Sequence, residues 1–436
     1  MSTLIALLDG VVVGTLTRAP KTAALAFTYE RAWRDHPDAY PLTPTMPLVR
    51  EAYAHEPVDL YLQGLLPDNG EVLAALARRH QVAASDAFAL LATIGEDCPG
   101  AIQFVRPERV DAVLRGDADG VVWLSDDDVA DRLAALRLPG APGRTETDIG
   151  QFSLPGRQPK TALLHDPERD RWGVPTGRVP TTHILKPAPA GYDRIAENEH
   201  LCLGLARALH LPAAHSAVLR VGAEAAIVVE RYDRFREPNG RLVRVHQVDM
   251  CQALGVSPKL KYEIEGGPTA PEIVTFLRER SAKPGEDIDT FVRALGLNWM
   301  IYGTDAHARN YSALLGSGGV LRLAPLYDLI SALPYRRKHG DSKIRLCMSI
   351  GGETHAKSVG AEAWRAFTDA AELRWDQVRE ALVELAHATP AALDEIATAG
   401  IEQDGLDAAF TQTFQRDAEK RARRCLHLLG EPRATS

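Results

Sequence analysis

The stretch Asp305–Asn310 (DAHARN), followed further along by Leu326–Asp328 (LYD), decides what kind of fold this chain is expected to adopt. Before it, Phe291–Tyr302 carries apolar residues at helical spacing and predicts a buried helix, which Gly303 ends. A carboxylate at the exit of a helix can accept the proton of an attacking hydroxyl group, and an asparagine oxygen shortly after it can bind Mg²⁺. The pattern therefore favours phosphoryl transfer, with the aspartate as proton acceptor and the asparagine at the metal.

A second carboxylate, Asp328, follows an apolar strand predicted over Val320–Leu323. In that position it can hold the metal ion that bridges nucleotide phosphates. The alternative is that Asp305 caps a turn, Asn310 forms an Asx-turn and Asp328 is a helix N-cap. Each residue taken singly is better explained by the alternative, whereas the three in this order and spacing favour phosphoryl transfer.

Lys186 ends a strand predicted over Thr182–Lys186, so its ammonium group can reach the α- and β-phosphates of a nucleotide. Alone, it would be better explained as an edge lysine that protects a strand from pairing. Glu199, on the next predicted helix, can orient this lysine as an ion-pair partner or can simply be a solvated glutamate near a helix N-terminus.

The loop Ser153–Lys160 (SLPGRQPK) precedes a predicted strand. Its glycine lets the backbone approach an anion, and its exposed N–H groups and Lys160 can hold phosphates. It lacks the G-x-x-x-x-G-K-[ST] pattern of a Walker A loop, and an ordinary surface turn explains the composition equally well.

Glu230–Arg234 (ERYDR) follows a strand predicted over Ala225–Glu230. Backbone groups of Glu230 and Tyr232 can hydrogen-bond an adenine there. Taken alone, the segment is better explained as the charged exit of a strand.

Bulk composition narrows the classes of function. The 436 residues are 45% hydrophobic and 25% charged, as in soluble globular proteins, and the net charge of −8 does not favour unaided binding to DNA or to an anionic membrane. The five cysteines are scattered, which fits neither a zinc site nor a disulfide framework and indicates a reducing, cytoplasmic location. The first residues predict a β-hairpin rather than a signal peptide, and no apolar run is long enough to span a membrane.

Three regions are expected along the chain, and together they predict an α+β fold. Residues 1–137 form an α+β subdomain, a linker follows at Leu138–Gly150, 151–234 form a β-rich small lobe, and 235–436 form a mainly helical large lobe with a β-like patch at 311–327. The remaining expected elements are hairpins of Leu4–Leu8 with Val11–Leu16 and of Thr161–His165 with Arg171–Val174, and helices at Gly70–Gln81, Ala84–Thr93 and Asn198–His210.

The order of motifs resembles the HipA-type Ser/Thr protein kinase toxins of bacterial HipBA toxin–antitoxin systems, over nearly the whole chain. The blocks that carry the resemblance are GLLPDNGEV, GEDCPGAIQF, SLPGRQPKTALL, THILKP, ENEHLCLGLARALHL, VVERYDR, HQVDMCQALG with KYE, GTDAHARN and LAPLYDLIS. The resemblance implies a bilobal protein-kinase-like fold of the lipid-kinase-like branch, preceded by an extra N-terminal α+β subdomain.

The resemblance also implies roles for individual residues. Asp305 would be the catalytic acceptor, Asn310 and Asp328 would bind Mg²⁺, and Ser153 would be the autophosphorylation site whose modification expels the loop and silences the kinase. The implied ATP-binding residues are Pro155, Gly156, Arg157, Gln158, Pro159, Lys160, Lys186, Glu230, Arg231, Tyr232, His307, Ala308, Arg309, Asn310, Tyr327 and Asp328. Two departures stand out: the loop contains two prolines, which lack an N–H, and Arg309 stands where the family usually has lysine.

The function implied is that of an ATP- and Mg²⁺-dependent toxin that phosphorylates an essential cytosolic protein, for example an aminoacyl-tRNA synthetase, and so arrests growth. A HipB-like helix-turn-helix antitoxin would restrain the kinase and supply the contact with DNA, and no membrane would be involved. Two alternatives stay open: a co-repressor that bridges antitoxin on DNA, and a small-molecule phosphotransferase.

Overall fold

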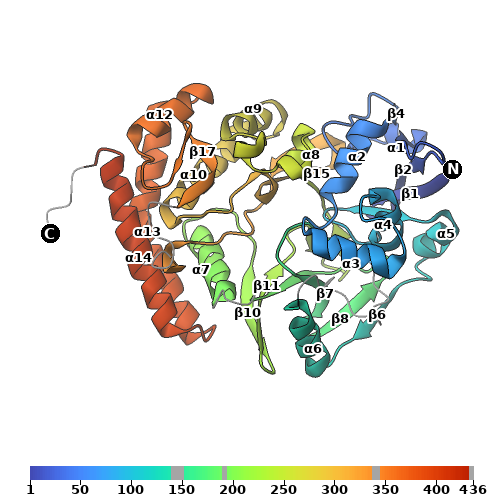
Figure 1. Cartoon of the computed structure of the whole chain (residues 1–436), viewed down its shortest axis with the longest axis horizontal. Coiled ribbons are helices and arrows are strands. Elements are labelled where there is room, and N and C mark those ends of the chain that lie inside the picture. The colour runs from blue at the N-terminus through green and yellow to red at the C-terminus, as the bar shows by residue number, and fades with distance from the viewer. Residues whose placement is uncertain (139–151, 189–193, 336–343, 432–436) are drawn as a thin grey trace. The chain divides into compact units, whose positions relative to one another are not determined.

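The computed structural model describes residues 1–138, 152–188, 194–335 and 344–431, which form an α+β protein (Figure 1). Their contacts divide the chain into two compact units. Unit 1 lies within Met1–Asp193, Leu219–Lys259 and Ala313–Leu321, and unit 2 lies within Arg194–Val218, Leu260–Ser312 and Arg322–Ser436. The linker expected at 138–150 falls, apart from its first residue, outside the described residues. No helix in the described part of the chain is long and apolar enough to cross a membrane.

Unit 1 begins with a five-stranded antiparallel sheet in the order β4-β3-β2-β1-β5. The predicted hairpin is confirmed: Asp9 and Gly10 both have positive φ, as a two-residue hairpin turn requires. The strands of this sheet are β1 Ser2–Leu8, β2 Val11–Arg18, β3 Leu25–Tyr29, β4 Ala52–Tyr53 and β5 Ile102–Val105. Its helices are α1 Arg31–Arg34, α2 His55–Gly64, α3 Gly70–His80, α4 Ala87–Ile94 and α5 Pro107–Arg115. Helix α4 starts later than expected because Asp86 caps it, accepting a hydrogen bond from the Ala89 N–H (3.0 Å).

A six-stranded sheet in the order β10-β11-β9-β7-β8-β6 follows. Its strands are β6 Gly120–Trp123, β7 Thr161–Asp166, β8 Arg171–Thr176, β9 His183–Pro187, β10 Ser216–Val221 and β11 Glu224–Glu230. Helix α6 (Asp126–Leu136) packs Val129, Leu133 and Leu136 against the sheet residues Leu163 and Leu185. This apolar core fixes the register in which the middle of β9 lies opposite β11 and β7.

The region after Arg234 differs from the mainly helical expectation. Three short strands, β12 Arg234–Arg236, β13 Leu242–Arg244 and β14 His246–Asp249, precede helix α8 Met250–Leu254. Two more strands, β17 Arg345–Ile350 and β18 Glu353–His355, interrupt the helices later. Four of these strands, β12, β13, β14 and β18, have only three or four residues, which is too short to show a clear hydrophobic period, and the sequence analysis also missed the six-residue β17. The expected β-patch is confirmed as β15 Ser312–Gly316 and β16 Val320–Leu323, which pair with β14 in one sheet.

Unit 2 is mainly helical. Its helices are α7 Ile195–Ala208, α9 Ala270–Arg280, α10 Pro284–Ile301, α12 Ala361–Ala370, α13 Trp375–Glu402 and α14 Ala408–Leu428. The two long C-terminal helices, α13 and α14, lie side by side (Figure 1). Helix α10 is buried along most of its length, and its Trp299 packs edge-on against Trp364 of α12, with ring centroids 5.7 Å apart. The predicted helix before the DAHARN stretch is confirmed, although it starts earlier, at Pro284.

Candidate functional site

The exit of helix α10 sets the position of the catalytic segment in unit 2. Tyr302 ends the helix in the left-handed region (φ 55°), and the Gly303 N–H donates to the Asn298 carbonyl at 2.7 Å. A Cβ atom at position 303 would lie 2.1 Å from Asn298 Oδ1, so only glycine fits without displacing that side chain. The backbone therefore leaves the helix sharply and brings Asp305 out of the buried layer.

Asp305 and Asn310 are tied together through the backbone. The Asp305 carbonyl accepts hydrogen bonds from the His307 N–H at 2.9 Å and from Asn310 Nδ2 at 2.6 Å. The Asp305 side chain is 53% exposed, and one of its oxygens lies 4.0 Å from His307 Nε2. Because the nitrogen of the Asn310 amide is used, its Oδ1 is the atom left to face a ligand. An exposed carboxylate and an oriented amide oxygen thus lie on one short turn.

Tyr327 joins this turn to the segment that carries Asp328. Its hydroxyl donates to the Arg309 carbonyl at 2.7 Å and lies 2.7 Å from Ser312 Oγ. Asp328 follows with φ 57°, a conformation that aspartate tolerates better than most residues. Unit 2 therefore brings the sequence-predicted residues Asp305, Asn310 and Asp328 into one part of the structure.

The donor set of unit 2 fits a magnesium ion that is bound together with a nucleotide. Mg²⁺ prefers oxygen ligands and is usually held by one or two carboxylates, with phosphates and water completing its octahedron. Asp328 offers a carboxylate and Asn310 an amide oxygen, whereas within the described residues no group of three or more His, Cys, Asp or Glu is arranged to hold a metal ion. When bound, the ion would neutralise phosphate charge.

Two further groups pack against the catalytic turn, and the motif analysis assigned neither of them a role. The Lys261 carbonyl accepts from the Ala308 N–H at 3.3 Å, and the Tyr262 ring meets His307 edge-on at 5.1 Å. Cys347 donates to the Thr304 carbonyl at 2.7 Å; burial, and then the nearby Asp305 charge, raises the pKa of its thiol to about 12. This thiol therefore stays protonated and inert. Lys261 and Tyr262 could have been found from the sequence, because they belong to the KYE block that carries part of the family resemblance.

Unit 1 contains the predicted ATP loop, the predicted phosphate lysine and the predicted adenine hinge. In the loop, Lys160 Nζ donates to the Pro155 carbonyl at 2.7 Å, and Gln158 Nε2 donates to the Pro187 carbonyl at 3.3 Å. Gly156 has φ 107°, which closes the loop over the lysine. The loop is therefore attached to the end of β9, the strand on which Lys186 lies opposite Ile227 of β11.

At the end of β11, Glu230 lies opposite His183, and the Arg231 N–H donates to the Thr182 carbonyl at 2.9 Å. The guanidinium group of Arg231 is buried in ion pairs with carboxylates of unit 1. The adenine contacts expected of the backbone groups of Glu230 and Tyr232 stay a prediction. Glu199 belongs to helix α7 of unit 2, and its ion pair with Lys186 stays a prediction.

A buried ionic cluster holds the hinge. It consists of Asp97, Asp233, Arg231, Arg234 and Arg244, and its carboxylates and guanidinium groups meet at distances between 2.9 and 3.5 Å. Burial alone would raise the pKa of Asp97, but Arg234, Arg231 and Arg244 outweigh it and hold that pKa well below its usual range. Burial, and then the charge of Arg231, lowers the pKa of Arg234 to about 10. Three guanidinium groups thus face two carboxylates, which leaves one positive charge in excess.

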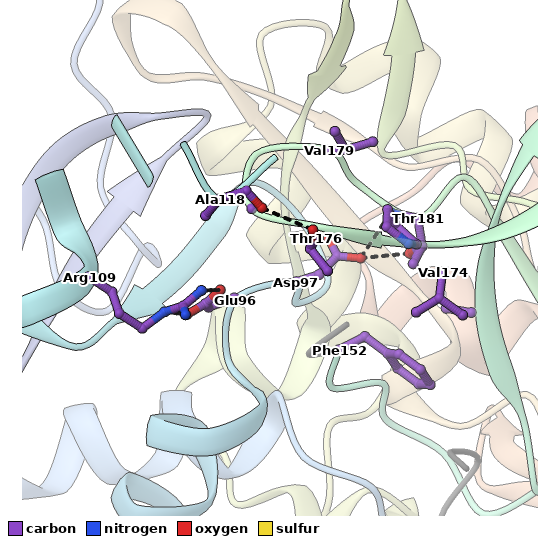
Figure 2. A pocket seen from close by; sticks show the side chains of 12 residues that line it. Glu96, Asp97, Arg109, Ala118, Phe152, Val174, Thr176, Val179 and Thr181 are labelled. Carbon is purple, nitrogen blue, oxygen red and sulfur yellow. Dashed lines mark hydrogen bonds and ion pairs between the residues drawn. The ribbon is translucent and has the colours of Figure 1, made fainter. Parts of the chain in front are cut away.

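Asp97 is the member of this cluster that reaches toward the loop, and it was not singled out from the sequence. Its carboxylate accepts from the N–H and the hydroxyl of Thr181 at 3.1 and 2.6 Å, as Figure 2 shows. Its carbonyl accepts from the Ser153 N–H at 2.9 Å. A cavity of about 260 Å³ lies beside these residues, with Phe152 in its wall and an ion pair of Glu96 with Arg109 at 2.8 Å (Figure 2). The base of the loop is therefore held by hydrogen bonds beside an open cavity.

A helix-exit carboxylate with an oriented amide in unit 2, and a strand lysine beside a loop in unit 1, are the features expected of a kinase of the protein-kinase-like α+β class. Comparisons with known proteins agree. The family model of the HipA-like C-terminal domain matches residues 152–393, and that of the HipA N-terminal domain matches residues 4–105. The chain belongs to the HipA family and is a Ser/Thr protein kinase, for which ATP is the phosphate donor.

Individual relatives match over nearly their full length. A putative kinase of Sinorhizobium fredii, Y4mE, is 32% identical over 399 residues, covering 89% of this chain and 90% of the relative. The Ser/Thr-protein kinase toxin HipA of Shewanella oneidensis is 28% identical over 448 residues, covering 98% and 96%. In solved structures, HipA in the complex of Shewanella oneidensis HipA, HipB and operator DNA matches with a TM-score of 0.82 and 26% identity, covering 99% of this chain and 100% of that chain.

Proposed function

We propose that the chain is the toxin of a HipBA-type toxin–antitoxin pair and phosphorylates a serine or threonine of an essential cytosolic protein, such as an aminoacyl-tRNA synthetase, to arrest growth. The observation that carries this proposal is the catalytic turn, in which the Asp305 carbonyl orients Asn310 while the Asp305 carboxylate stays exposed. An exposed carboxylate can accept the proton of a protein hydroxyl group, which a buried one could not reach.

In this proposal the remaining residues bind different parts of ATP and its magnesium ion. Lys186 and the loop residues 155–160 hold the phosphates, backbone groups at Glu230–Tyr232 hold the adenine, and Asn310 with Asp328 binds Mg²⁺. His307, Ala308, Arg309 and Tyr327 would contribute further nucleotide contacts from unit 2. Positioning and charge neutralisation supply most of the rate enhancement in phosphoryl transfer, so these contacts matter as much as the acceptor.

Two restraints complete the proposal. Ser153 becomes phosphorylated, and because a phosphate carries about two negative charges and cannot donate the hydroxyl bond, the loop leaves its seat and ATP binding is lost. A HipB-like helix-turn-helix antitoxin binds the kinase, holds it inactive and makes the contact with DNA. The second restraint is supported by the relative whose structure contains HipB and operator DNA.

Growth and mass spectrometry test the proposal together. Expression of the wild type should arrest growth, and expression of Asp305→Ala should not. The purified wild type incubated with ATP and Mg²⁺ should carry phosphate on Ser153, whereas Asp305→Ala should not. Asp369→Asn, a change at an exposed aspartate on helix α12, serves as the matched control and should behave like the wild type. Equal toxicity of the wild type and Asp305→Ala would refute a kinase-driven toxin.

A further inference from the structure

The loop 153–160 is held from within by the bond from Lys160 to the Pro155 carbonyl, and further by partners elsewhere in unit 1. Its two prolines lack an N–H, and its two backbone hydrogen bonds within the described part of the chain both run to residues that precede it. One joins the Ser153 N–H to the Asp97 carbonyl, and the other joins the Asp68 N–H to the Gly156 carbonyl at 3.3 Å. The conformation of the loop therefore depends on partners in the N-terminal part of unit 1.

Side chains add two further bonds to the same turn, which lies between helices α2 and α3. Ser153 is 1% exposed, and its hydroxyl donates to the Leu65 carbonyl at 2.7 Å. Asn69 Nδ2 donates to the Arg157 carbonyl at 3.4 Å. Three of these four bonds involve the turn Leu65–Asn69 and are spread along the loop from residue 153 to residue 157, and a fifth bond joins Gln158 to the Pro187 carbonyl of β9.

Apolar packing fixes the base of the loop, where Phe152 and Leu154 form a small buried cluster with Ala162, but it leaves open space on two other sides. The cavity of about 260 Å³ lies against one side of Phe152, at the base of the loop (Figure 2). A second, much smaller space of about 30 Å³ separates the loop from Val72 and Leu76 of α3. Atoms that line a void lose packing contacts. Hydrogen bonds therefore contribute more to the stability of the loop's position here than they would in a closely packed core.

We propose that Asn69 is a positioning residue for the ATP loop: its amide joins the start of helix α3 to the middle of the loop, so that the N-terminal turn Leu65–Asn69 sets the loop's position and with it the affinity for ATP. This rests on the proposed function, because it takes 155–160 as the phosphate-binding loop. The amide has two separate tasks. Its Oδ1 caps α3 by accepting from the N–H groups of Glu71 (2.9 Å) and Val72 (3.4 Å), and only its Nδ2 reaches the loop.

The two tasks can be separated by substitution. Asp and Ser at position 69 both keep an oxygen that caps the helix, and neither offers the N–H pair of the amide. Asn69→Ser and Asn69→Asp should therefore leave folding unchanged while they release the loop. The matched control is Asn239→Ser, which removes a similar amide from an exposed turn of unit 1, where it bonds to Glu237 and Arg241.

The first measurement needs no ATP. Trypsin cleavage after Arg157 in the native protein reports how often the loop detaches from the turn Leu65–Asn69. We expect cleavage to be several-fold faster in both Asn69 variants and unchanged in Asn239→Ser, with equal thermal midpoints in all four proteins. Equal cleavage rates in the wild type and the Asn69 variants would overturn the proposal.

The second measurement separates positioning from a general loss of structure. Loss of one hydrogen bond corresponds to a change of about fivefold in an equilibrium, so KM for ATP should rise by about that factor while kcat changes less than twofold. An unchanged KM in variants that are cleaved faster would overturn the link to ATP affinity. If neither the wild type nor the variants bind ATP although cleavage responds to Asn69, the contact between the turn and the loop is upheld and the proposed function fails.

Discussion

The hinge cluster of unit 1 and the catalytic turn of unit 2 are both built around aspartates, yet they are constructed in opposite ways. Asp97 is buried with its charge shared among three guanidinium groups, whereas the side chain of Asp305 is 53% exposed and is positioned through its backbone carbonyl. Buried charges are stable only beside close ion-pair partners, which fix their geometry, whereas exposed charges remain available for chemistry. The comparison indicates that in this chain the predicted adenine hinge is fixed by ionic burial and the predicted catalytic turn by backbone hydrogen bonds.

Replacing Asp305 and Asp97 in turn by asparagine tests this comparison. The largest effect is expected on the kinase activity of Asp305→Asn. Asp305→Asn keeps the shape of the side chain but removes the proton acceptor, so transfer of labelled phosphate to Ser153 should fall by roughly 100- to 10,000-fold. The free energy of unfolding should stay within about 0.5 kcal/mol of the wild type, because the side chain is mostly solvated. Retained activity in this variant would remove Asp305 from the mechanism.

Asp97→Asn should show the reverse pattern. Three guanidinium groups would then share one carboxylate, and breaking such a buried pair typically costs about 3–5 kcal/mol. Urea unfolding followed by tryptophan fluorescence measures this loss. Asp117→Asn is the control, because Asp117 forms an exposed pair with Arg115 and its removal should cost less than about 1 kcal/mol. A loss no larger than that of the control would mean that the cluster does not hold the hinge.

Acid should weaken the unit that contains the hinge through His246. Its Nδ1 accepts from the Ala101 N–H, its Nε2 lies 2.8 Å from the Leu42 carbonyl, and burial lowers its pKa to about 4. Between pH 6.5 and 4 the unfolded chain binds a proton here that the folded chain does not, so stability falls as the pH drops through this range. The shift corresponds to a loss on the order of 3 kcal/mol.

The test is the slope of unfolding free energy against pH. His246→Gln should flatten the slope between pH 6.5 and 4 without removing it, because burial, and then His165, also lowers the pKa of His183 to about 4. An identical slope in the wild type and His246→Gln would show that His246 titrates equally in the folded and unfolded chains.

The catalytic turn could be predicted from the sequence and the hinge cluster could not, and the reason is physical. The catalytic turn is local: a helix, a glycine and six consecutive residues contain Asp305 and Asn310, so spacing alone indicated phosphoryl transfer. The hinge cluster is not local, since Asp97 meets residues more than 130 positions later, and one sequence does not encode such pairings as a pattern. The bonds from Leu65–Asn69 to the loop could not be predicted for the same reason. Strands β12 to β14 were missed because they are too short to show a hydrophobic period.

The smallest expected effect concerns the hydrogen bond that joins the catalytic turn to the segment that carries Asp328. Tyr327→Phe removes the hydroxyl that donates to the Arg309 carbonyl and leaves the ring in place, so the cost should be about 1 kcal/mol in unfolding free energy. Activity should fall by a few-fold, since the segment that bears Asp328 would be held less firmly. Ser312→Ala, which removes only the partner of the same hydroxyl, should cost less on both measures. If Tyr327→Phe matched the wild type in both stability and rate, the catalytic turn would be fixed by its own backbone alone, and the contrast with the hinge cluster would become sharper.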